Sequence, residues 1–447
     1  MLQFGTQKSP KTWAEKLTDS AYFEAAIEKL HSKFASETRH KLHELQSEGF
    51  SFDQLFYDRK KLAKVLARDV SGSRYSFSPA TIRQITIKNK RRTIYSFTLF
   101  DRIVHTALFA MLAEDIQPLF PAEVYSYIKG KDRMDAIEAF MQYIRKHRAR
   151  YKQPLRRGFF VCHFDIKSYG ESIPVTPSSG LWTELNRLFT QAYGRLPDEQ
   201  EQQLLNSLIR PEIESADKNL YENTVGITDG APITSLLLNL YVRPLDTFLS
   251  NIKGGFYARY GDDILFAHED LDVFNSAMAG IAEQLARLHL QQNTKKTKML
   301  FFNAAGRAKD SFKGSTAIEF LGMQLCFDGT AALKKNKITD IMHDIKNRIS
   351  ATVKQLPDYS LDEQGKLICS IVNKTLDPKD PMANPYAIFL RRIVNHRGQL
   401  KDVDYRIARL ILETLTGDAS VKKFRTIPFK KMRDEWKLLS VEYERNQ

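Results

Sequence analysis

At 447 residues the chain is long enough for two or three structural units, because a single hydrophobic core usually stops growing at roughly 250–300 residues. Hydrophobic residues at 43% exclude a disordered chain, and a formal net charge of +14 is typical of a polyanion-binding protein, with ordinary solvated basic faces as the alternative. Three widely separated cysteines, Cys162, Cys326 and Cys369, exclude a disulfide framework and a zinc knuckle.

The N-terminal part of the chain predicts helices followed by a hairpin. It has no secretion-type apolar region, and no uncharged run is long enough to cross a bilayer, so we expect a cytoplasmic protein without a membrane partner. Phe23, Ile27 and Leu30 recur at helical spacing, which predicts mostly helical structure over residues 12–68. Residues 81–97 carry a β pattern on both sides of the basic stretch 88–91, which predicts a hairpin with a cationic tip.

The middle of the chain alternates between helical and β patterns. Helices are predicted at 102–119, 134–148, 197–218 and 233–249, and a buried strand at 159–164 ends at Asp165. Two β-rich arms, 256–260 and 264–267, flank the tight turn Gly261-Asp262-Asp263. A basic strand at 298–302 and an apolar run at 317–327 follow, and the chain after about residue 331 is predicted to be helical.

Acidic residues at the ends of apolar strands form the candidate catalytic centre. A surface turn rich in Gly and Asp is common, but this one lies between two apolar arms, where an acid pair needs a cation. Asp165 repeats the same feature upstream. Phosphoryl transfer to a 3′-hydroxyl uses two divalent cations roughly 4 Å apart, which two or three converging aspartates can hold.

These residues resemble the motifs of reverse transcriptases. The first and third palm motifs are matched by Phe164-Asp165-Ile166-Lys167 and Tyr260-Gly261-Asp262-Asp263, with 97 residues from the first aspartate to the second. Gly230-Ala231-Pro232 with Asn239 resembles the second palm motif, and Asn293 with Lys296-Thr297 resembles the fourth. Phe320-Leu321-Gly322 resembles the primer grip. Arg92-Thr93-Ile94 and Asp101 to Val104 resemble the fingers motifs of retron and group II intron enzymes. The resemblance covers residues 81–330.

The resemblance implies an RNA-directed DNA polymerase with an α+β, right-hand fold. Residues 1–80 would be a helical N-terminal extension, residues 81–330 the fingers and palm with an antiparallel sheet plus helices, and residues 331–447 an all-helical thumb. Its substrates would be nucleoside triphosphates, with RNA as template and DNA as product. A protein partner or a homo-oligomer stays open.

The same resemblance assigns roles to single residues. Asp165 and Asp262 would bind two Mg²⁺ ions, with Mn²⁺ as an alternative, helped by Asp263 and the Ile166 carbonyl. Contacts to the incoming nucleotide would come from Lys88, Lys90, Arg92, Gly170, Asp229, Gly230 and Lys296. A solvated hairpin tip and a plain surface lysine are the alternatives for the basic members of this set.

Two further groups of residues would hold the nucleic acid. Phe320, Leu321 and Gly322 would form the primer grip, with ordinary sheet core as the alternative. The thumb would hold duplex through basic residues, and Phe424 and Phe429 between them would either stack on bases or anchor the helices. These basic residues are Arg391, Arg392, Lys422, Lys423, Arg425, Lys430 and Lys431.

Two positions depart from the family pattern. Gly170 stands where most members carry a bulky aromatic residue that excludes a ribose 2′-hydroxyl, so sugar selectivity depends on whether Tyr169 or another side chain fills the space. Asp229 stands where the second motif normally has Gln, so an acceptor-only carboxylate replaces an amide. We expect Asp229 to restrict the sequence of the products, unless it caps the helix predicted at 233–249 or pairs with Arg259.

The subgroup that the chain most resembles is the bacterial defence-associated and abortive-infection reverse transcriptases. This implies a role in antiphage defence with a dedicated non-coding RNA. A retron-type enzyme, a template-independent or RNA-synthesising polymerase, and a catalytically silent nucleic-acid scaffold are the alternatives; the intact aspartates speak against the last.

Overall fold

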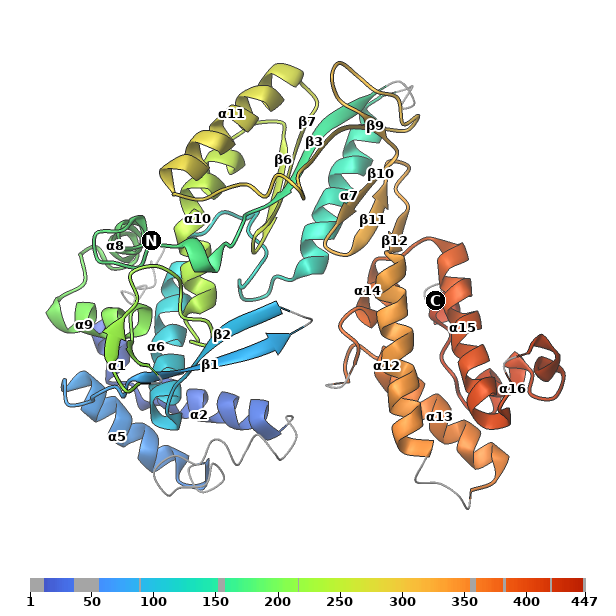
Figure 1. The fold of residues 1–447 in the computed structure, drawn as a ribbon, viewed down its shortest axis with the longest axis horizontal. Coiled ribbons are helices and arrows are strands. Elements are labelled where there is room, and N and C mark those ends of the chain that lie inside the picture. The colour runs from blue at the N-terminus through green and yellow to red at the C-terminus, as the bar shows by residue number, and fades with distance from the viewer. Residues whose placement is uncertain are drawn as a thin grey trace, which may run out of the picture. The chain divides into compact units, whose positions relative to one another are not determined.

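The computed structural model describes residues 12–35, 56–87, 90–151, 157–215, 217–353, 359–380, 383–418 and 420–444. The chain forms two compact units that interleave along the sequence (Figure 1). The first comprises residues 1–132, 164–264 and 272–297, and the second residues 133–163, 265–271 and 298–447. The predicted division at residues 80 and 330 stays a prediction. Within the described ranges, no helix is long and apolar enough to cross a membrane.

The N-terminal helices of the first unit pack on a long apolar helix. These are α1 (Trp13–Leu17), α2 (Ser20–Ala35) and α5 (Arg59–Ser71), and α2 lies against both α5 and α6 (Leu99–Ile116). A capping box of Thr12 and Glu15 begins α1. Lys16 then joins α1 to α6 through ion pairs of 3.1 Å to Glu114 and 2.8 Å to Asp115. The helical prediction for 12–68 is confirmed where the structure describes it; 36–55 lie outside.

The predicted hairpin is present and belongs to a larger sheet. Strands β1 (Ala80–Ile87) and β2 (Lys90–Ser96) pair antiparallel, while residues 88 and 89 at the tip lie outside the described part. The strand order is β2-β1-β4-β5, with β4 (Glu212–Glu214) parallel to β1 and β5 (Leu220–Glu222) antiparallel to β4. The helix predicted over 197–218 is therefore too long, because α9 (Glu199–Ile209) ends before β4.

A five-stranded sheet carries the acidic strand ends. Its order is β6-β7-β3-β8-β9, formed by β6 (Phe256–Tyr260), β7 (Asp263–His268), β3 (Gly158–Asp165), β8 (Lys298–Asn303) and β9 (Gly314–Ser315). The central strand β3 buries Phe159 to Cys162 and Phe164, which is why its sequence is an apolar run. The strand predictions for 159–164, 256–260, 264–267 and 298–302 are confirmed.

The first unit also contains further helices and short helical turns. They are α8 (Gly180–Tyr193), α10 (Thr234–Ser250), α11 (Leu271–Arg287) and the short 3₁₀ turns η1 (Gln117–Leu119) and η3 (Gly170–Ser172). The helix α10 keeps Pro244 in its interior. In the second unit, α7 (Arg133–Arg150) packs Phe140 against Phe159 and Phe302, with ring centroids 6.2 and 6.3 Å away.

The second unit continues with a small sheet and then helices. Strands β10 (Ala317–Phe320), β11 (Met323–Cys326) and β12 (Ala331–Leu333) pair antiparallel in that order. The helical elements that follow are α12 (Lys335–Val353), α13 (Leu361–Leu376), α14 (Ala387–Arg392), α15 (Arg397–Thr416), η4 (Val421–Arg425), α16 (Phe429–Asp434) and α17 (Val441–Glu444). The helical prediction after residue 331 is confirmed except for β12, and the chain as a whole is α+β.

Candidate active site

The first unit contains a cleft of about 1390 Å³ at the ends of β3 and β6. It brings together residues from α2, β2, α6, the segment 225–238, the turn after β6 and the segment before β8. Seven residues predicted from the sequence line it: Asp165, Ile166, Gly170, Asp229, Gly230, Asp262 and Lys296. The fold therefore brings these seven predicted residues together in one cleft, and their roles stay predictions.

The two principal aspartates are held on adjoining stretches of main chain. Asp165 ends β3, and the next residue, Ile166, donates its backbone N–H to the carbonyl of Asp262 at 3.1 Å. The Asp165 carbonyl in turn accepts from the N–H of Asn293 at 2.8 Å. Gly261 adopts φ of 67°, which lets the chain turn between β6 and β7 and present Asp262. Backbone hydrogen bonds thus fix how the two carboxylates lie.

The charges in the cleft are unbalanced around Asp262. Partial desolvation in the cleft, followed by the negative charge of Asp165, raises the pKa of Asp262, although its side chain keeps contact with solvent. Lys296 Nζ lies 2.5 Å from Asp165 Oδ2, and this hydrogen bond raises the pKa of the lysine. Lys296 is thus the partner of Asp165, beside a second carboxylate whose negative charge is disfavoured.

The donor set fits a hard divalent cation. Carboxylate oxygens of Asp165 and Asp262 and the main-chain oxygen of Ile166 are the ligand types that Mg²⁺ accepts, and a cation would relieve the disfavoured charge on Asp262. Asp263 begins β7 and is not among the residues that line the cleft. In the described residues no three His, Cys, Asp or Glu side chains are already gathered for a metal ion, so the third ligand stays a prediction.

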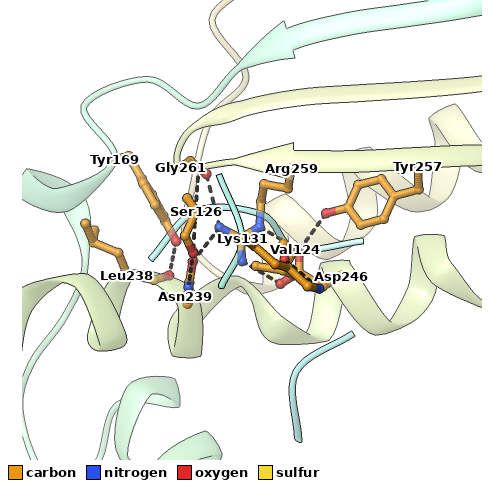
Figure 2. A network of polar contacts seen from close by, with 10 residues as sticks. All are labelled: Val124, Ser126, Lys131, Tyr169, Leu238, Asn239, Asp246, Tyr257, Arg259 and Gly261. Atoms are coloured by element: carbon orange, nitrogen blue, oxygen red, sulfur yellow. Dashed lines mark hydrogen bonds and ion pairs between the residues drawn. The ribbon is translucent and has the colours of Figure 1, made fainter. Parts of the chain in front are cut away.

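A buried polar network supports the acidic turn (Figure 2). Arg259 is fully buried and binds Asp246 of α10 through two contacts of 2.7 Å, from Nε to Oδ1 and from Nη2 to Oδ2. Its Nη1 donates to the carbonyl of Gly261 at 3.1 Å and to Oδ1 of Asn239 at 3.0 Å. The Gly261 N–H donates to Ser126 Oγ at 2.8 Å. Both backbone polar groups of Gly261, the residue before Asp262, are therefore held by buried side chains.

Arg259 stays charged in this position. Burial alone would lower the pKa of its guanidinium, but the charge and hydrogen bonds of Asp246 raise it above its ordinary value. The partner of Arg259 is therefore Asp246, and the predicted alternative of a pair with Asp229 is wrong. Two features of the sequence point to such a pair, an arginine inside an apolar strand and an acid inside an apolar helix, but neither feature shows that the two residues meet.

Gly230 and Asp229 connect the cleft to β2. Gly230 has φ of 105°, and a Cβ there would lie 2.8 Å from the carbonyl oxygen of Tyr95, so no other residue fits without a shift of the backbone. The carbonyl of Asp229 accepts from the Tyr95 N–H at 3.0 Å. Its side chain is exposed, and α10 has Ile233 as N-cap without a side-chain cap, so the alternative of a helix cap is also wrong.

The comparison with protein families shows the family of this chain. The reverse transcriptase (RNA-dependent DNA polymerase) family matches residues 82–325. The chain belongs to this family. It is an RNA-directed DNA polymerase, a nucleotidyltransferase, and the matched residues include the acidic strand ends and the cleft segments from β2 to Lys296.

Solved structures and curated proteins add the following. The Candida albicans telomerase in complex with a fragment of telomeric RNA is 12% identical, with TM-score 0.48, over 87% of this chain and 71% of that one. Two structures of apo telomerase from Candida tropicalis are 12% and 11% identical, with TM-scores 0.45 and 0.44. The first match covers 83% of this chain and 61% of the telomerase chain. The second, a telomerase truncated from its C-terminal domain, covers 58% of this chain and 55% of its own. Curated proteins yield no match.

Near Gly170 this reverse transcriptase leaves room in the cleft. A Cβ on Gly170 would meet its nearest neighbour, Leu238 Cδ2, at 3.6 Å, an ordinary van der Waals distance. Tyr169 is 7% exposed, and its hydroxyl donates to the carbonyl of Leu238. The Tyr169 ring is thus committed to the core, and the space beside Gly170 can accept a side chain.

The basic residues predicted to hold the triphosphate lie mostly outside the described part. This applies to Lys88 and to the side chains of Lys90 and Arg92, whose main chain belongs to β2. Thr93 and Tyr95 of the same strand do line the cleft. The role of the three basic residues stays a prediction.

The predicted primer grip is a hairpin turn in the second unit. Phe320 ends β10 and is buried, and Leu321 and Gly322 form the turn to β11 with φ of 48° and 89°. A Cβ on Gly322 would lie 3.5 Å from the ring of Tyr386. Phe320 thus has the environment of ordinary sheet core, while the contact of the turn with a primer stays a prediction.

The basic residues of the second unit occupy different environments. Arg391 and Arg392 end α14, and Lys431 on α16 pairs with Asp362 at 2.7 Å. The remaining predicted residues are Lys422, Lys423 and Arg425 on η4 and Lys430 on α16. Phe424 stacks on Tyr405 with centroids 6.0 Å apart, and both Phe424 and Phe429 are half-buried. Nucleic-acid binding by this group stays a prediction.

Proposed function

We propose that this polymerase extends a 3′ end by two-metal phosphoryl transfer, with Asp165 and Asp262 as the ligands shared by both Mg²⁺ ions. The observation that carries the proposal is that these carboxylates lie on hydrogen-bonded main-chain segments in one cleft, where the pKa of Asp262 is raised. When bound, the ions would activate the attacking hydroxyl and neutralise the leaving pyrophosphate. Asp263 would assist as a third ligand.

Lys296 would change partner during the reaction. It holds Asp165 at 2.5 Å, and its raised pKa keeps it protonated. A cation that takes the Asp165 carboxylate would release the ammonium group, which is 60% exposed at its side chain and free to turn toward the leaving phosphates. Lys296 would then hold the leaving pyrophosphate and supply a proton to it.

The test is single-nucleotide incorporation by Asp165→Ala and Asp262→Ala. Each should abolish incorporation while circular dichroism and RNA binding stay near those of the parent, because neither side chain fills core volume. Asp217→Ala, which removes an exposed acid from the β4–β5 turn of the same unit, is the matched control. Incorporation near the parent rate in both test variants would reject the metal assignment.

We further propose that the enzyme works in antiphage defence with a dedicated non-coding RNA, in a bacterial cytoplasm. This rests on the resemblance to defence-associated reverse transcriptases. Sequencing of the co-purifying nucleic acid before and after nuclease treatment should recover one enriched RNA. Loss of phage protection in cells with Asp262→Ala should follow, and an unenriched RNA population together with unchanged protection would reject the proposal.

Template-independent synthesis is the alternative that two residues favour. Gly170 leaves space in the cleft, and the Asp229 side chain is exposed within it. Incorporation measured with and without an added RNA template separates the two activities. Equal incorporation in both reactions would favour the template-independent enzyme.

A further inference from the structure

Tyr127 is an unusual residue in the wall of the catalytic cleft. Its side chain is 51% exposed, and its backbone has φ of 58°. A bulky non-glycine residue in this region is uncommon and strained, and such strain persists only where the surrounding structure enforces it. Asn, Asp or Gly would adopt this conformation more readily, so the tyrosine is not explained by the turn alone.

The segment before Tyr127 is fastened to β6 by a short ladder of main-chain hydrogen bonds. The Arg259 N–H donates to the carbonyl of Glu123 at 3.0 Å, and the Tyr125 N–H donates to the carbonyl of Arg259 at 2.9 Å. Val124 forms a parallel bridge with Arg259, whose side chain anchors the network of Figure 2. The segment therefore moves with the strand that delivers Asp262.

The residues on both sides of this position are also fixed. Ser126 is fully buried, and its Oγ accepts from the N–H of Gly261 at 2.8 Å. Gln117 Nε2 donates to the carbonyl of Tyr127 at 3.0 Å, and Gln117 Oε1 accepts from the Lys129 N–H at 3.2 Å. The structure thus holds the strained backbone from both directions and leaves the aromatic ring partly in solvent.

The other aromatic residues that line the cleft are committed to protein contacts. The Tyr169 ring is buried, the Tyr95 hydroxyl accepts from Asn223 Nδ2 at 3.0 Å, and Phe109 lies under Lys29 Nζ at 5.9 Å. Tyr127 is the exposed member of these four. Partial burial, and then the charges of Tyr260, Asp262 and Asp229, raise the pKa of its phenol, so its ring lies in the field of the catalytic turn.

We propose that Tyr127 is a substrate-contacting residue whose ring packs against the base of the incoming nucleoside triphosphate beside Asp262. This rests on the proposed function, which places the nucleotide at Asp165 and Asp262. A π-face stacks on any base, so the contact suits a polymerase that must accept all four nucleotides. The fixed backbone holds the ring in place before the substrate arrives, which reduces the entropy lost on binding.

The positive φ provides an unusually sharp test, the substitution Tyr127→Gly. Glycine adopts φ of 58° without strain, so this variant should unfold at the same urea concentration as the parent or at a higher one. It should nevertheless bind nucleotide at least about fivefold more weakly, the lower end of the loss of one base stack. Tyr127→Phe should bind as the parent does. A role in folding alone predicts the reverse, with stability lost and binding retained.

Binding is measured without turnover. The parent and variants are given a DNA primer with a 3′-dideoxy end on an RNA template, and each deoxynucleoside triphosphate is titrated for its protection of the complex against heparin. The matched control is Tyr57→Ala, which removes a ring that is 86% exposed in the same unit and does not line the cleft. Nucleotide binding by Tyr127→Gly equal to that of the parent overturns the proposal, as does a parent complex that gains no protection from any nucleotide.

The test of Tyr127 can fail or succeed independently of the test of the metal ligands. If Asp262→Ala retained activity while Tyr127→Gly still lost nucleotide protection, the proposed metal ligands would be wrong and the role of Tyr127 would stand. If Asp262→Ala lost activity while Tyr127→Gly kept its nucleotide protection, only the role of Tyr127 would fall.

Discussion

The buried pair of Arg259 and Asp246 allows stability and catalysis to be separated by substitution. Both side chains are 0% exposed and are joined by two contacts of 2.7 Å. Removing one partner of such a pair costs about 3–5 kcal/mol, because it leaves a buried charge unpaired. A folded domain has only about 5–15 kcal/mol in total. Arg259→Met should therefore unfold at a much lower urea concentration than the parent.

A variant that removes the whole polar pair should regain stability. Replacing buried ion pairs by apolar residues of similar volume is often neutral or stabilising. The Tyr257 hydroxyl also donates to Asp246 at 2.5 Å, so it must be removed as well. The combination Arg259→Met, Asp246→Leu and Tyr257→Phe should therefore unfold within about 1 kcal/mol of the parent.

This triple variant should still fail in catalysis. It lacks the Arg259 Nη1 contacts to Gly261 and Asn239, so the backbone of Gly261, next to Asp262, loses one of its two anchors. A displacement of about 1 Å at a reacting centre costs roughly a hundredfold in rate. The assay combines urea unfolding, followed by the fluorescence of Trp13 and Trp182 in the same unit, with single-nucleotide incorporation. A triple variant that recovers both stability and the parent kcat would refute the positioning role.

Four other outcomes follow from single features of the chain. Gly170→Phe should increase the preference for deoxynucleotides over ribonucleotides in matched competition, because the site has room for a side chain; strong discrimination by the parent would show that another residue closes the pocket. Asp229→Gln should broaden product sequences on unrelated templates, since an amide both donates and accepts; faithful full-length copies by the parent on every template would contradict this. Burial lowers the pKa of His105 to about 3, so below about pH 6.5 the unfolded chain binds a proton that the folded chain does not. Protonation of His105 in the unfolded chain should therefore lower the free energy of unfolding by about 2 kcal/mol between pH 7 and pH 5. Urea titrations of His105→Phe at the two pH values should not show this loss. RNA affinity should fall by orders of magnitude between about 50 and 200 mM salt if roughly six or more phosphates are contacted; a flat response would mean that the basic clusters are solvated faces.

Local sequence patterns predicted the elements that carry the acids. The strand before Asp165 and the two arms around Asp262 are apolar runs that end at a charge, and burial on both faces of a central strand produces such runs. The turn between the arms needs a residue with positive φ, and Gly261 supplies it. Both features depend on neighbours in sequence, which is why they could be recognised without a structure.

Contacts between distant segments could not be predicted in the same way. A pair of Arg259 with Asp229 was one alternative from the sequence, but the partner is Asp246, because the choice depends on how α10 packs against β6. The strand β4 is three residues long with one buried side chain, Ile213, which is too short for alternation to stand out. Tyr127 has positive φ without any glycine or asparagine to signal it.

Two cations near the acidic turn, Arg259 and Lys296, have different electrostatic roles. Arg259 is buried with its own counter-ion, Asp246, so the pair brings hydrogen bonds to the turn but no net charge. Lys296 is exposed and its partner is Asp165, one of the two proposed metal ligands. An incoming divalent cation therefore competes with the lysine, whose ammonium group regains water on release, while the buried arginine has no solvent to receive it. In the proposed mechanism the cleft would thus exchange Lys296 for metal while Arg259 keeps the turn in place, which would couple metal entry to the release of one positive charge toward the phosphates.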